Sequence, residues 1–105
     1  MKVLATKTMM REINKALHAN GEKMRAEYVT MSRRAFSFYV DSDIWENERD
    51  YMPDTDEMRA IKILYPPEYY AMPQYLTSAE LVMIFQKSDK TFDGFMDAVI
   101  ESIQI

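Results

Sequence analysis

Apolar residues recur at helical spacing close to the amino terminus. Met9, Ile13 and Leu17 follow one another at steps of four, and Gly21 comes shortly after the last of them. This spacing places the three side chains on one face of a helix, and Gly readily adopts the left-handed conformation that closes a helix. The pattern therefore predicts an amphipathic helix from about residue 8 to residue 20.

Three later stretches alternate between apolar and polar side chains, which predicts β-strands. The run from Lys23 to Met31 and the run from Ala35 to Val40 are separated by Ser32-Arg33-Arg34, so we expect them to form a hairpin with its turn at these three residues. The third run, from Met58 to Tyr65, is partly apolar on both sides, as expected of a central strand. Pro66-Pro67 ends it.

The last third of the chain has helical signals. Thr77-Ser78-Ala79-Glu80 has the form of a capping box, in which the first and fourth side chains satisfy free backbone groups at a helix start. This predicts a helix that runs to about Lys87. A second helix should begin near Thr91, because apolar residues follow it at steps of three and four.

Together these elements predict an α+β fold in one domain spanning residues 1–105. A small antiparallel sheet of about three strands should pack against an N-terminal helix and two C-terminal helices. The predicted core comprises Ile13, Leu17, Tyr28, Phe36, Phe38, Ile61, Ile63, Leu81, Ile84, Phe85, Phe95, Val99 and Ile103.

Composition narrows the class of protein. With 48% hydrophobic and 29% charged residues in 105, the chain belongs with globular proteins. It contains no Cys, which excludes disulfides and thiolate chemistry. No apolar run is long enough for a signal peptide or a membrane-spanning helix, so we expect a cytoplasmic protein that does not contact a membrane.

Charge is distributed unevenly along the chain. Residues 1–40 carry a net charge of +5, residues 41–57 carry −7 and residues 58–105 carry −2. The middle block, which we call the acidic segment, also contains two aromatic residues and is expected to be a connecting segment. Its carboxylates and aromatics are the candidate partner-binding residues: Asp41, Asp43, Trp45, Glu46, Glu48, Asp50, Tyr51, Asp54, Asp56 and Glu57.

Aromatic side chains beside charged ones are typical of protein interfaces, and spaced carboxylates can imitate the phosphates of a nucleic acid. We therefore interpret the chain as a non-enzymatic protein-binding module whose partner has a basic surface, such as a nuclease or another nucleic-acid-binding enzyme. The carboxylates could also suggest calcium. However, Glu46 and Arg59 stand where EF-hand loops starting at Asp41 and Asp54 need glycine, so no metal site is predicted.

A second hypothesis is direct binding of nucleic acid through basic residues of the first helix and the predicted hairpin. Its candidate residues are Lys7, Arg11, Lys15, Arg25, Arg33 and Arg34. A sequence pI near 5.0 argues against it, since nucleic-acid-binding domains are usually basic overall.

A third hypothesis is a structural or oligomerising module. Its interface would combine the apolar carboxyl end, Ile103-Gln104-Ile105, with a segment at residues 65–75 that holds four of the seven tyrosines. Catalysis is not predicted and no cofactor is expected. His18 is the only histidine, and no Ser lies in a recognisable nucleophile motif.

No motif in the chain matches a named family. In general character the chain, which is small, acidic, rich in Met and Tyr and free of Cys, resembles accessory proteins of phages and mobile elements. That group includes anti-CRISPR inhibitors. The resemblance implies a compact α+β protein that blocks a nucleic-acid channel.

Overall fold

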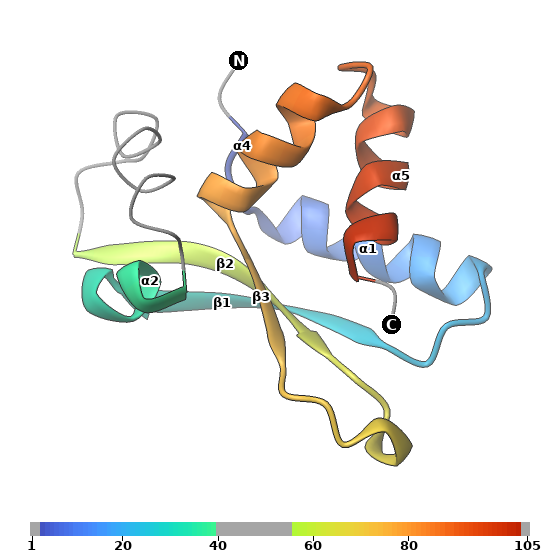
Figure 1. Ribbon diagram of the computed structural model, residues 1–105, viewed down its shortest axis with the longest axis horizontal. Coiled ribbons are helices and arrows are strands. Elements are labelled where there is room, and N and C mark those ends of the chain that lie inside the picture. Colours follow the sequence, from blue (N-terminus) through green and yellow to red (C-terminus); the bar gives the residue numbers. More distant parts are fainter. Residues whose placement is uncertain (1–2, 40–55, 104–105) are drawn as a thin grey trace.

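The computed structural model describes residues 3–39 and 56–103. Within these ranges the chain begins with a helix and ends with two successive helices, and the strands lie between them (Figure 1). In chain order the elements are α1 (Lys7–Ala19), β1 (Arg25–Ser32), α2 (Arg33–Tyr39), β2 (Glu57–Leu64), the 3₁₀ turn η2 (Pro67–Tyr69), β3 (Gln74–Thr77), α4 (Ser78–Lys87) and α5 (Phe92–Ile103). The predicted α+β class, with one N-terminal helix and two C-terminal helices, is confirmed.

The described strands form one antiparallel sheet in the order β1-β2-β3, so β2 is central as predicted. Opposed residues in antiparallel strands project to the same face, and successive residues alternate between faces. Ala26, Ile61 and Leu76 therefore share one face, which we call the inner face. Met58 and Tyr75 lie on the other, outer face.

Helices α1, α4 and α5 lie on one side of the sheet, above it in Figure 1. Ile61 and Ile63 of the inner face pack in one apolar cluster with residues of these helices. Most of the predicted core is buried there, with Ile84 and Phe85 only partly buried at its edge.

The first helix begins and ends close to the predicted positions. The Thr6 hydroxyl accepts a hydrogen bond from the Met9 N–H, which caps the helix start. At the other end, Gly21 has φ +74° and its N–H donates to the His18 carbonyl, while the Glu22 N–H donates to the Leu17 carbonyl. These two bonds form a Schellman motif, so Gly21 closes the helix as expected.

Asn14 joins α1 to the free edge of the sheet. Its Nδ2 donates to the Ala26 carbonyl at 2.8 Å, and its Oδ1 accepts from the Ala26 N–H at 2.7 Å. β1 is the edge strand among the described residues, and Ala26 turns both backbone groups away from β2. The Asn14 amide thus satisfies these groups as a neighbouring strand would.

The predicted second strand at 35–40, with its turn at Ser32-Arg33-Arg34, is wrong. Residues 33–39 form α2, which follows β1 directly. The Ser32 hydroxyl accepts from the Ala35 N–H, and the Ser37 hydroxyl donates to the Arg33 carbonyl. A helix advances about 100° per residue, so Phe36 and Phe38 point in nearly opposite directions.

Phe36 is fully buried on the outer face, in a second cluster with Met58 and Ala79. Phe38 is 81% exposed, so its predicted place in the core is wrong. The helical period explains both positions, because one face of a seven-residue helix can bury only one of the two rings. Tyr28, also predicted in the core, is half-buried.

The strand β3 was not predicted. It is only four residues long, it follows Pro73, and it ends in the residue that caps α4. The capping box itself is confirmed: the Glu80 N–H donates to the Thr77 hydroxyl at 3.3 Å, and that hydroxyl lies 3.4 Å from Glu80 Oε1. Strand and helix therefore meet at Thr77 without a loop.

The buried Ser78 hydroxyl connects three parts of the fold. It accepts from the Ala5 N–H at 3.0 Å and donates to the Arg59 carbonyl at 3.4 Å. The N-terminal segment is thereby held against the start of α4 and against β2.

Replacing Asn14 tests the link between α1 and β1. Asn14→Ala leaves both backbone groups of Ala26 without their partner, so the free energy of unfolding should fall by about 1–3 kcal/mol. Urea denaturation measures the change. Lys15→Ala, an exposed neighbour on the same helix, is the control. An equal effect of the two substitutions would show that the Asn14 bonds contribute nothing specific.

Candidate docking surface

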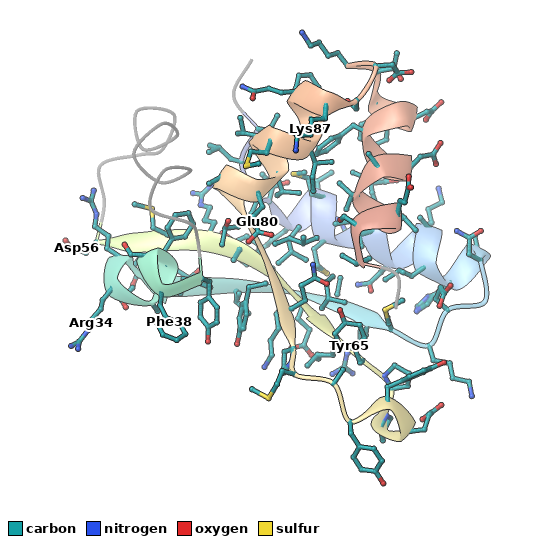
Figure 2. The ribbon with its side chains drawn as sticks, viewed as in Figure 1. Arg34, Phe38, Asp56, Tyr65, Glu80 and Lys87 are labelled. Atoms are coloured by element: carbon teal, nitrogen blue, oxygen red, sulfur yellow. The ribbon has the colours of Figure 1, made fainter. Side chains whose placement is uncertain are left out.

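Three aromatic rings form a continuous row from α2 to β3. Tyr39 stacks on Tyr75, with ring centroids 4.4 Å apart and planes inclined by 29°. Phe38 meets Tyr39 edge to face at 5.2 Å. We call Phe38, Tyr39 and Tyr75 the aromatic ridge. It lies on the outer face, and Phe38 projects from α2 on the side of the sheet away from α4 and α5 (Figure 2).

The ridge lies at the end of α2 that leads into the acidic segment. Tyr39 is the last described residue before residues 40–55, and Asp56 is the first after them. The Asp56 carbonyl accepts from the Arg33 N–H at 3.1 Å, which holds the start of β2 against the start of α2. Asp56 and Glu57 are both exposed. The chain therefore joins the anionic sequence covalently to the aromatic end of the molecule.

Most of the predicted partner-binding residues lie outside the described residues. These are Asp41, Asp43, Trp45, Glu46, Glu48, Asp50, Tyr51 and Asp54. The ridge was missed by sequence reasoning because residues 35–40 were interpreted as a strand. Helical spacing of Phe36 and Tyr39, three residues apart, is the signal that could have placed Phe38 outward.

The candidate basic residues are divided among three elements of the fold. Lys7, Arg11 and Lys15 are exposed on α1, which covers the inner face, whereas Arg33 and Arg34 begin α2. Arg25 starts β1, roughly 25 Å along the strand from Arg33.

Several of these cations also have local partners. The Arg25 guanidinium pairs with Glu27 at 2.7 Å, and the Lys7 ammonium lies 5.9 Å from the centre of the Tyr28 ring. The Arg11 guanidinium donates to the Thr8 hydroxyl at 3.3 Å. Three of the six candidate cations thus contact neighbouring side chains of the same chain.

Two cavities of about 430 Å³ each open on the described part of the molecule. The polar cavity is lined by Gly21, Glu22, Lys23, Met24, Pro66, Glu68 and Tyr69. The apolar cavity is lined by Val3, Leu4, Thr6, Met9, Phe85, Lys90, Phe92 and Phe95. His18 is exposed and lines neither cavity. Within residues 3–39 and 56–103, no three His, Cys, Asp or Glu side chains gather closely enough to hold a metal ion.

Glu80 is the titratable group with the most altered environment among the described residues. Partial burial raises its pKa to about 7, although hydrogen bonds from Thr77 act in the opposite direction. A carboxyl group with such a pKa can serve in acid–base catalysis. Glu80 lies in the first turn of α4, where its N–H donates to the Thr77 hydroxyl and its Oε1 lies 3.4 Å from that hydroxyl.

Comparisons with family models, with curated proteins and with solved structures gave no match to this chain. None of the helices in the described part is both long and apolar enough to cross a bilayer.

Replacing Glu80 with Gln tests its effect on stability. The folded-state pKa of about 7 exceeds the ordinary value of 4.5, so the folded state holds this proton more tightly. The protonated Glu80 carboxyl group therefore adds to the free energy of unfolding. This contribution is complete below pH 4.5 and is lost as pH rises through 7. The loss should be up to about 3 kcal/mol.

Urea denaturation at pH 5 and pH 8 measures this loss. Glu80→Gln should unfold with a smaller difference between the two pH values than the unsubstituted chain. Glu101→Gln, an exposed change on α5, should leave the difference unchanged. The same pH dependence in all three proteins would contradict the assignment to Glu80.

Proposed function

We propose that this chain is a non-enzymatic protein-binding module that docks its aromatic ridge and its acidic segment on a basic surface of another protein. One observation carries the proposal: an 81% exposed Phe38 continues a packed row of rings that includes Tyr39, two residues before the start of a sequence with a net charge of −7. Aromatic anchors next to charge are the common composition of protein interfaces.

The ridge is preorganised for contact. Tyr39 and Tyr75 hold each other by stacking, and the buried Phe36 fixes α2 against Met58. Rings already held in place lose little conformational entropy on binding, so more of their burial appears as affinity. The acidic segment would add long-range attraction and faster association with a positive surface.

Charge also selects the class of partner. A symmetric dimer through the ridge would bring two segments of net charge −7 close to each other, which like-charge repulsion opposes. Ile103, proposed above for a homomeric interface, is buried in the core. A different protein with a basic surface is therefore a better partner for this face than a second copy.

The most specific form of the proposal is an inhibitor of a nucleic-acid-binding enzyme, in the manner of anti-CRISPR proteins. In this form the carboxylates of the acidic segment replace nucleic-acid phosphates in a basic channel. The general character of the sequence supports this form. Direct nucleic-acid binding has less support, because the candidate cations are divided between α1, α2 and the start of β1.

Affinity capture from the native host, followed by titration of the purified partner, tests the proposal. Exposed charges are screened by salt, so binding should weaken steeply between about 50 and 500 mM salt. Phe38→Ala should weaken binding roughly tenfold or more, as expected of an interface anchor. In a second variant, every Asp in residues 41–57 is replaced by Asn and every Glu by Gln, eight changes in all. The affinity of this variant for the partner should no longer depend on salt.

The chain offers a matched control. Phe92→Ala removes another exposed phenylalanine, but from α5 on the opposite side of the sheet, and should not change partner binding. Affinity that stays flat with salt, or equal losses in the two Phe variants, would refute the proposed surface. A gel shift with generic DNA or RNA would favour direct nucleic-acid binding instead, and a salt-resistant dimer in light scattering would favour an oligomerising module.

A further inference from the structure

The apolar cavity lies on the opposite side of the sheet from the aromatic ridge. Its wall combines the N-terminal segment, the start of α1, the end of α4 and the first turns of α5. A volume of about 430 Å³ is within the range of small-molecule sites in proteins. Phe95 and Val3 are buried, whereas Phe92 is 59% exposed at the rim.

Hydrogen bonds on both sides hold this cavity in shape. The Ala5 N–H donates to the buried Ser78 hydroxyl, and Thr6 caps α1, so the N-terminal segment is fixed at two adjacent residues. Across the cavity, the Ser88 hydroxyl accepts from the Lys90 N–H and fixes the turn between α4 and α5. The cavity is therefore preformed.

The lining has an aromatic side and one charged group. Phe85 and Phe95 meet edge to face with ring centroids 5.7 Å apart. Among the described residues that line the cavity, Lys90 is the only ionisable one. No carboxylate in the described part of the chain pairs with its ammonium. Its neighbour Asp89 accepts instead from the Thr91 hydroxyl at 2.7 Å and from the Thr91 N–H.

We propose that the apolar cavity binds a small amphipathic carboxylate. The apolar body of the ligand lies against Met9, Phe85 and Phe95, and its carboxylate pairs with Lys90. A few polar groups at the mouth of an apolar pocket normally fix the orientation of a ligand in this way. The single positive charge selects an anionic head over a cationic one. This site is independent of the proposed docking function.

Titration with decanoate, followed by NMR and by calorimetry, tests the site. Decanoate should bind saturably and shift the methyl signals of Val3, Leu4 and Met9. Decylamine, which has the same chain and the opposite charge, should bind at least several-fold more weakly. Lys90→Asn should weaken decanoate binding roughly two- to fivefold, the effect of one exposed ion pair.

Asn suits this position because Lys90 has φ +64°, a conformation that Asn tolerates better than most residues. Lys87→Asn removes a nearby exposed ammonium that does not line the cavity, and should leave binding unchanged. Phe38→Ala should also have no effect, which separates this site from the aromatic ridge. Absence of saturable binding, equal binding of decylamine, or an unchanged affinity in Lys90→Asn would overturn the proposal.

Discussion

The direct passage from β3 into α4 at Thr77 and Ser78 is the constraint on which the other parts depend. Thr77 is at once the last residue of a strand and the cap of a helix, and both residues are buried. Since no loop separates the two elements, the pairing of β3 with β2 also sets where α4 begins. Ser78 then holds the N-terminal segment through Ala5.

Residues at or near the junction of β3 and α4 hold both of the proposed binding surfaces in place. On the outer face, Ala79 packs against Phe36 and so supports the helix that presents Phe38. Tyr75, two residues before the junction, supplies the third ring of the aromatic ridge. On the inner side, the bond from Ala5 to Ser78 positions the segment that lines the apolar cavity. One short stretch of chain thus organises two surfaces on opposite sides of the sheet.

Sequence patterns predicted the elements in which several local signals agreed. The first helix had both an apolar period and a closing Gly21, and α4 had a complete capping box. The patterns gave a wrong prediction at residues 35–40. Phe36 and Phe38 alternate with smaller or polar residues, as in a strand. The Ser32 cap and the burial of only one of the two rings favour a helix instead. The patterns also missed β3, whose four residues are too few to show a period. The aromatic ridge joins these two places, so it could not be predicted without tertiary packing.

The bonds between Asn14 and Ala26 have a consequence for how the chain avoids self-association during folding. An uncovered strand edge can recruit strands from other molecules and so start aggregation. Here the covering helix immediately precedes the strand in the sequence, with a connection of only five residues. Contacts between such close neighbours form early, because little chain entropy is lost in closing them. We therefore expect Asn14 to cover the strand edge at Ala26 before the more distant β3 joins the sheet.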